Sequence, residues 1–392
     1  MILAKRSIKL VYRLLFKLLF FFSFIYVNIN IFEFFNTYLI YEMEKIEKYL
    51  KLCSENILIK NKNFKKTKDP WISIITPVYN KEKTIHRYLR SIQNQLFNSI
   101  EIIFIDDKSN DNSIKIIEEL QKKDERIILI KNKKRKGTLI SRNRGVLKSK
   151  GEFLLLVDPD DIISENILKY TYRLAKKYDY DLTRYNIYVG NYELNLPEVV
   201  GYLNDEPIFK PYIYLYLFYG LGKLLQLDYY VTNKLIKKNL FIRALNSINR
   251  YYLKQFMVDC EDGMINFMLY KLSNSLYFTK RIGYYYIKTK KSITSGLVDF
   301  KKRLKSNFLY FRFIFLSTKN NSIEKIIANY IFHEVNYYHP EIINLLKEDS
   351  KDFKLYKNTI NLFIENEFIS LNSKKILKNM RKAINNLTIS LL

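Results

Sequence analysis

The chain has 392 residues, 48% of them hydrophobic and 16% aromatic, so it can bury one large core and is too apolar to be disordered throughout. Its formal net charge of +27 would attract nucleic acid, anionic lipid or phosphorylated substrates. The lysines are spread along the chain, and no helix-turn-helix, zinc-finger or RNA-binding signature accompanies them, so we expect no nucleic-acid partner. Two cysteines and three scattered histidines exclude a disulfide framework and a thiolate or imidazole metal site.

The N-terminal segment 1–36 combines positive charge with an apolar run. Five basic residues precede residues 18–35, which approach the ~20 apolar residues of a membrane-spanning helix. Basic residues before the run favour a single-pass anchor with a cytoplasmic N-terminus, type II-like, which in a eukaryote would mean the endomembrane system or Golgi. Two alternatives stay open: a helix lying on the membrane surface, because Lys5, Lys9, Arg13 and Lys17 recur every four positions, or a signal peptide or soluble arm.

Residues 37–69 are predicted to form a stem, helical over 42–59 and followed by a lysine-rich linker. Asp69-Pro70 marks the start of a domain over 70–300. Residues 301–392 are lysine-rich with helical periodicity, and we expect a helical C-terminal extension that caps this domain.

From residue 70 onward, short apolar runs alternate with amphipathic segments. This pattern predicts an α/β fold with a mainly parallel sheet covered by helices on both faces. The expected strands are 71–75, 100–105, 126–130 and 153–157, and the expected helices are 82–96, 112–121 and 137–147.

Two of these strands end in acidic turns. The run 153–157 leads into Asp158, Asp160 and Asp161, and the second strand leads into Asp106-Asp107. In open α/β sheets ligands bind at the carboxyl ends of the strands, and paired carboxylates that repel one another suit a hard divalent cation. The alternative is a plain strand-to-helix turn in which Asp161 or Ser164 caps the next helix.

Several short motifs occur in a characteristic order, and together they resemble the family 2 glycosyltransferases, which are inverting, nucleotide-sugar-dependent enzymes of the GT-A fold. The resemblance covers about residues 70 to 300. Its motifs lie at 73–80, 105–111, 137 with 141–145, 150–152 leading to 158–161, and more loosely at 233–235, 261–263 and 284–286 with 292–294.

The resemblance implies a nucleotide pocket at the first two strand ends. Thr76, Pro77 and Tyr79 would line the pocket for the base, with the Tyr79 ring stacking on a pyrimidine. Asp107 would accept a hydrogen bond from the base. The alternative for Tyr79 is ordinary core packing.

The resemblance also implies that the diphosphate and ribose lie further along the same edge of the sheet, the rim formed by the carboxyl ends of the strands. Asp158 would contact the ribose, and Asp160 would hold Mn²⁺ or Mg²⁺ bridging the two phosphates. Arg142 and Asn143 would lie near the nucleotide, or else are polar residues on a helix surface.

Asp262 would be the general base that takes the proton from the acceptor hydroxyl. An apolar setting and the adjacent Glu261 would raise its pKa. The alternative is that Glu261 and Asp262 only open a helix over 264–272, where acids favour the N-terminus. Lys108 and Ser141 depart from the commonest family pattern without removing a chemical group.

The sequence therefore predicts a membrane-anchored, metal-dependent inverting glycosyltransferase that uses a nucleotide sugar, with a UDP-sugar as the expected donor, and a glycan, lipid or protein acceptor. Two alternatives from other classes remain: a catalytically silent nucleotide-sugar-binding or scaffold protein of the same fold, and a basic nucleic-acid-binding protein.

Overall fold

The computed structural model describes residues 65–191, 198–200, 205–209, 230–253, 257 and 261–288, together with 306, 309, 310, 312–314, 316 and 317. The chain divides into two compact units, Met1–Ile59 and Lys60–Leu392, and every described residue belongs to the second. The expected anchor over 1–36, the helix over 42–59 and most of the extension over 301–392 lie outside the described residues. Within the described part, no helix has the length and apolarity that a membrane crossing needs.

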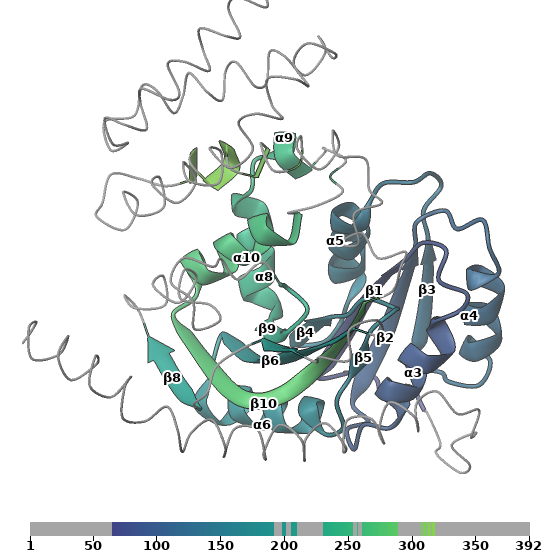
Figure 1. Cartoon of the computed structure of the whole chain (residues 1–392), viewed down its shortest axis with the longest axis horizontal. Helices are drawn as coiled ribbons and strands as arrows, with labels where there is room; N and C mark the ends of the chain where they lie inside the picture. The colour runs from purple at the N-terminus through teal and green to yellow at the C-terminus, as the bar shows by residue number, and fades with distance from the viewer. Residues whose placement is uncertain are drawn as a thin grey trace, which may run out of the picture. The chain divides into compact units, whose positions relative to one another are not determined.

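Strands and helices alternate through the first half of the described residues (Figure 1). In chain order the elements are β1 (Ile72–Val78), α3 (Ile85–Gln93), β2 (Ile100–Asp106), α4 (Ser113–Gln121), β3 (Ile127–Lys131), α5 (Thr138–Lys148), β4 (Phe153–Leu156), β5 (Ile162–Ile163), α6 (Ile167–Tyr178), β6 (Leu182–Asn191), β7 (Glu198–Val200), β8 (Glu206–Phe209), β9 (Lys234–Lys237), α8 (Lys238–Ser247), α9 (Arg250–Leu253), α10 (Glu261–Leu272) and β10 (Ser275–Lys288).

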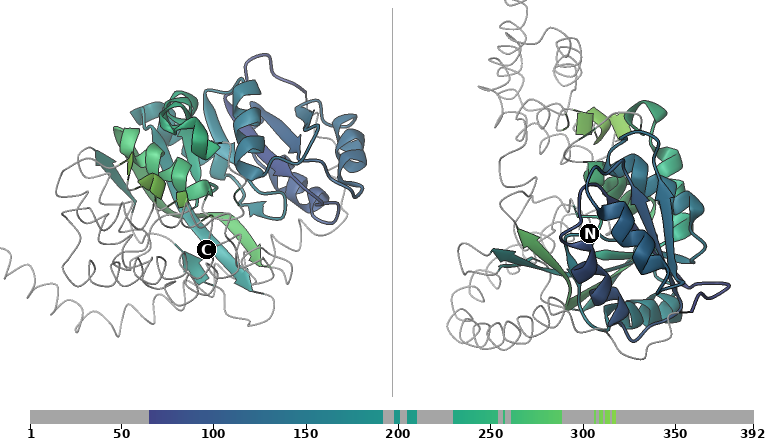
Figure 2. Two further views of the ribbon diagram at one scale, coloured as in Figure 1. Left: turned by 90° about the horizontal axis from the view of Figure 1, so that it is seen from above. Right: turned by 90° about the vertical axis from the view of Figure 1, so that its right-hand side faces the viewer.

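One sheet runs through the domain in the order β3-β2-β1-β4-β9-β6-β10-β5, with β7 paired to β6 and β8 to β10. The strands β3, β2, β1 and β4 are parallel, as the sequence predicts for this half. At β9 the direction reverses, because β9 pairs antiparallel with both β4 and β6. In the left-hand view of Figure 2, the purple and blue elements of the first half lie to one side and the green helices of residues 238–272 to the other.

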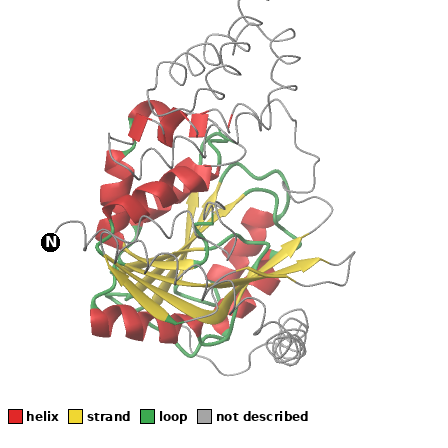
Figure 3. Ribbon diagram, turned by 60° about the vertical axis from the view of Figure 1, so that its left-hand side comes forward, coloured by secondary structure: helices red, strands yellow, loops and turns green. Residues whose placement is uncertain are grey.

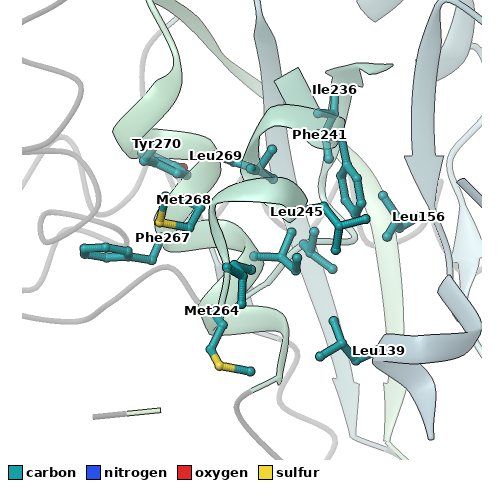
Figure 4. Packing of buried hydrophobic residues seen from close by; sticks show 14 of the residues in the cluster. Leu139, Leu156, Ile236, Phe241, Leu245, Met264, Phe267, Met268, Leu269 and Tyr270 are labelled. Atoms are coloured by element: carbon teal, nitrogen blue, oxygen red, sulfur yellow. The ribbon is translucent and has the colours of Figure 1, made fainter. Parts of the chain in front are cut away.

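Both faces of the sheet are covered by helices, as expected for an α/β domain (Figure 3). On one face, residues of α3, α4 and α6 form a cluster with side chains such as Ile74 and Phe104 of the strands. On the other face, residues of α5, α8 and α10 pack against alternate residues of the same strands. Figure 4 shows part of this second cluster, with Leu139 of α5, Leu156 of β4, Phe241 of α8 and Leu269 of α10.

The described elements confirm the expected order up to β4, with boundaries that differ by a few residues. The turn after β4 differs from the alternative considered above. Asn166, in the left-handed conformation, stands at the N-cap of α6, so neither Asp161 nor Ser164 caps that helix. Instead the chain pairs Ile162–Ile163 with β10 before the helix begins. The turn therefore carries its acids for a reason other than capping.

Candidate active site

The strand ends meet at one edge of the sheet. In the parallel register, Val78 at the end of β1 lies beside Asp106 of β2, and Ile75 lies beside Leu156 at the end of β4. Tyr79, Asp107 and the Asp158 turn therefore follow neighbouring strands at the same edge. This is the edge at which open α/β sheets bind ligands.

A buried arginine joins the two halves of the site. Arg142 of α5 has a side chain only 4% exposed, and its guanidinium donates to Asp262 Oδ1 and, over 2.7 Å, to Asp158 Oδ1. Burial alone would lower the pKa of Arg142, but the Asp262 and Asp158 carboxylates outweigh it and raise that pKa. Asp158 and Asp262 thus share one cation, and Asp262 lies 120 positions from the arginine that supplies it.

Asp262 lies in the first turn of α10, where the helix N-terminus favours a carboxylate. Its side chain is 28% exposed, so it is partly shielded yet open to the rim. Burial raises the pKa of this carboxyl group to about 6, and Asp158 adds to the increase, while Arg142 opposes it. A carboxylate with this pKa is ionised near neutral pH and still basic enough to accept a proton.

The turn after β4 presents its three carboxylates in three different settings. Asp158 faces Arg142, and the Asp160 carboxylate lies 2.5 Å from Lys81 Nζ. Asp161 is buried and accepts hydrogen bonds from the Tyr284 hydroxyl at 2.6 Å and the Ile287 N–H at 3.1 Å.

Burial, followed by the nearby Asp160 and Asp158, raises the pKa of Asp161 well above its ordinary value. The Tyr284 hydroxyl also accepts from the Asp158 N–H at 3.3 Å. Strand β10 therefore holds this turn in place through Asp161, which leaves Asp158 and Asp160 on the rim.

Asp107 organises the loop before α5. Its carboxylate accepts hydrogen bonds from Asn132 Nδ2 and from the backbone N–H groups of Lys136 and Gly137, all at 2.8 Å. Gly137 has a φ of 88°, a conformation that suits glycine. A carboxylate has about four acceptor positions, so these three bonds leave one position unused on a residue that is only 4% exposed.

The other residues predicted for the nucleotide pocket differ in burial and in the direction of their side chains. The Tyr79 ring is half-buried, with the Arg135 guanidinium 3.9 Å from its centroid. Pro77 is buried, and the Thr76 hydroxyl faces the core, where it bonds to the Tyr88 hydroxyl. Asn143 Oδ1 is shielded from solvent without a hydrogen-bond partner. The Tyr79 ring is thus at the rim, while the Thr76 side chain is used by the fold.

The residue pair at the start of β9 is buried. Asn233 and Lys234 are both 0% exposed, and Lys234 Nζ donates to Asn233 Oδ1 at 2.7 Å and to the Tyr230 carbonyl. Asn233 Nδ2 donates to the Tyr185 carbonyl at 3.2 Å. These bonds fix the start of β9, and Lys234 also lowers the pKa of Asp262 slightly against the effect of burial.

The side chains at this edge of the sheet can supply only part of the ligand set of a divalent cation. Among the described residues, no three His, Cys, Asp or Glu side chains form a group that could hold a metal ion by themselves. Mg²⁺ commonly uses one or two protein carboxylates and completes its shell with phosphate oxygens and water. The carboxylate of Asp160 is 27% exposed and could supply one such ligand, although in this structure it is paired with Lys81.

Some rim residues were not predicted from the sequence, namely Lys81, Arg87, Arg135 and Tyr284. Each lies in or near a matched motif, but the sequence offers so many lysines, arginines and tyrosines that none stands out. Their partners lie up to 126 residues away, and the sheet order decides those pairings.

The parallel half-sheet, the acidic rim and the carboxylate on α10 define a GT-A-like α/β domain. Residues 73–243 match the family model described as Glycosyl transferase family 2, so this part of the chain is similar to that family.

Two relatives from Streptococcus pneumoniae serotype 4 align with the chain. The glycosyltransferase GlyG is 34% identical over 121 residues, which cover 31% of this chain and 38% of GlyG. The glycosyltransferase GlyA is 27% identical over 270 residues, 67% of this chain and 37% of GlyA. The chain thus matches less than two-fifths of the length of each relative.

Among solved structures, S. aureus TarS 1-349 in complex with UDP-GlcNAc is similar to the chain. It has a TM-score of 0.57 and 20% identity, covering 81% of this chain and 89% of that one. At this identity the likeness supports the fold, and it agrees with the GT-A-like topology described above.

Proposed function

We propose that this protein is an inverting glycosyltransferase that moves a sugar from a UDP-sugar to a hydroxyl group of an acceptor. The observation that carries the proposal is the Arg142 bridge, which brings Asp262 to the same rim as Asp158 and the strand ends. GlyG and GlyA are named glycosyltransferases, and TarS binds UDP-GlcNAc, which supports a UDP-sugar donor.

In the proposed reaction, Tyr79 and Asp107 hold the base and Asp158 holds the ribose. Asp262 takes the proton from the acceptor hydroxyl while its oxygen attacks C1 of the sugar, and the bond between C1 and the diphosphate breaks with its electron pair going to the diphosphate. Asp160 would hold Mn²⁺ or Mg²⁺ together with the phosphates, an ion that stabilises the charge of the departing diphosphate.

Release of UDP from a panel of UDP-sugars by the purified full-length protein with Mn²⁺ tests this proposal. We expect release from at least one donor, and a loss of about 10²–10⁴-fold in an Asp262→Asn variant. Binding of the donor, seen as thermal stabilisation, without UDP release in either protein would instead favour a silent nucleotide-sugar-binding protein.

Attachment to a membrane through residues 1–36 is a separate proposal, supported by the basic residues that precede the apolar run 18–35. Fractionation of cells that express the protein, with and without those residues, tests it. Recovery of the complete protein in the supernatant would argue against it.

A further inference from the structure

The backbone of Lys81 is fixed where two loops pair. The loop after β1 and the loop after β2 exchange hydrogen bonds: Asn110 N–H donates to Asn80 Oδ1 at 2.8 Å, and Asn80 N–H donates to Ser109 Oγ at 3.1 Å. The Lys81 N–H itself donates to Ser113 Oγ at 2.8 Å. These contacts hold the residue at the rim before any ligand binds.

The side chain of Lys81 crosses from this loop to the acidic turn after β4. Its Nζ lies 2.5 Å from Asp160 Oδ2, and the two side chains are 32% and 27% exposed. Arg87 of α3 donates to the Asp160 carbonyl at 2.6 Å, and its Nε is shielded from solvent without a hydrogen-bond partner. Two cations from one neighbouring segment therefore converge on Asp160, one on its carboxylate and one on its backbone.

The Lys81 contact occupies the carboxylate assigned above to the divalent cation. A positive ammonium group and a divalent cation bound to the same carboxylate would repel each other, so the two compete for Asp160. In the proposed function, the donor's diphosphate would share that cation, so its phosphate oxygens would lie near Lys81. A lysine ammonium group is a compact charge on a flexible stem and a common ligand of phosphate.

We propose that Lys81 exchanges partners during donor binding: it neutralises Asp160 in the empty site and binds the diphosphate once a divalent cation replaces it. The inference rests on the proposed function for the cation and the donor. It adds a ligand for the diphosphate and a competition between lysine and metal at Asp160.

The Lys81→Met variant of the full-length protein separates these two roles. Binding of Mn²⁺ without nucleotide is measured by electron paramagnetic resonance of the free ion, and binding of UDP at saturating Mn²⁺ is measured by calorimetry. We expect Mn²⁺ to bind about three- to tenfold more tightly, because the competing ammonium group is gone, and UDP about tenfold more weakly, because a charged hydrogen bond to phosphate is lost.

Two further variants serve as controls. Lys83→Met removes an exposed lysine two positions away and should change neither constant. In an Asp160→Asn background, Lys81→Met should no longer strengthen Mn²⁺ binding, because the shared carboxylate is absent. Lys81→Gln repeats the test with a polar side chain if the methionine variant folds poorly.

Opposite changes in the two constants support the proposal. Unchanged constants, or a parallel weakening of both ligands, overturn it and leave Lys81 as a structural ion pair. A protein that binds Mn²⁺ and UDP with these changes but transfers no sugar would contradict the proposed function alone. UDP release with unchanged constants in the variant would contradict the Lys81 proposal alone. Failure of the wild type to bind either ligand overturns both.

Discussion

Replacing Arg142 by methionine removes the guanidinium group that contacts both Asp158 and Asp262. A carboxyl group that loses a neighbouring cation is harder to ionise, so the pKa of Asp262 must rise. At about 4 Å and an effective dielectric constant of about 20, such a pair contributes about 4 kcal/mol, and water at the rim reduces this value. Cations beside carboxylates typically lower the pKa by about 1 to 3.

The pKa of Asp262 is about 6 with Arg142 present. Without Arg142 we expect a value of roughly 7 to 9. Since Asp262 accepts a proton only when ionised, wild-type activity should fall as the pH drops below about 6, and the fall in the variant should begin at least about one pH unit higher. At neutral pH the variant should lose roughly tenfold for a pKa near 8 and regain activity in alkaline buffer.

The assay is the initial rate of UDP release at saturating donor, measured from about pH 5 to about pH 9.5. Arg144→Met is the matched control, because Arg144 lies on the same helix and donates instead to the Lys131 carbonyl and Asn132 Oδ1. Its pH profile should match the wild type. If Arg142→Met lowered the rate equally at every pH, Asp262 would not be the group that titrates, and the assignment of the base would be wrong.

Three further substitutions test the packing of the domain by urea or thermal unfolding. The Arg126 guanidinium is 2% exposed and donates two hydrogen bonds of 2.8 Å to the Asp124 carboxylate. Asp124→Ala leaves this buried cation unpaired and should lower the unfolding free energy by about 3–5 kcal/mol. Gly145→Ala would place a methyl group 2.6 Å from Ile105 Cδ1, and crowding should exceed the gain in helix propensity, for a net loss of about 1–2 kcal/mol. Tyr284→Phe removes the hydroxyl group that bridges the turn after β4 and should cost about 1–3 kcal/mol.

The controls for the Asp124 and Tyr284 variants are exposed residues of the same kind. Glu118→Ala breaks a half-exposed ion pair with Lys131 and should cost less than about 1 kcal/mol. Tyr178→Phe removes the hydroxyl of a tyrosine that is 52% exposed and should leave the unfolding free energy nearly unchanged. Equal losses for the buried and the exposed member of a pair would contradict the assigned contacts. A raised melting temperature for Gly145→Ala would contradict the tight packing of α5.

The order of the first half of the fold could be predicted because its signals are local. Apolar runs such as 100–105 are long enough to identify a strand, and β2 extends from Ile100 to Asp106. The two-residue strand β5 carries no periodic signal of its own, because its pairing with Tyr284 and Tyr285 of β10 creates it. The mixed half of the sheet depends likewise on contacts between distant segments.

The candidate site likewise divides into features with a local sequence signal and features that depend on contacts between distant residues. Motif order predicted that Asp107, Asp158 and Asp160 follow the ends of two strands of the sheet, and the carboxyl ends of parallel strands meet at one edge. It could not predict that Asp107 binds the loop before α5, or that Lys81 covers Asp160. Such partners depend on side-chain direction in the folded protein rather than on spacing along the chain.

The reversal of strand direction at β9 has a consequence for how this protein can diversify. Three residue pairs, Phe153 to Leu155 against Lys237 to Leu235, join the two halves of the sheet there. The residues proposed to bind the nucleotide belong to the half of the sheet that ends with β4 and the turn after it. The helix that carries Asp262 belongs to the other half. Loops of the later half can therefore lengthen or change to suit a new sugar-accepting partner, while the earlier half keeps the same donor.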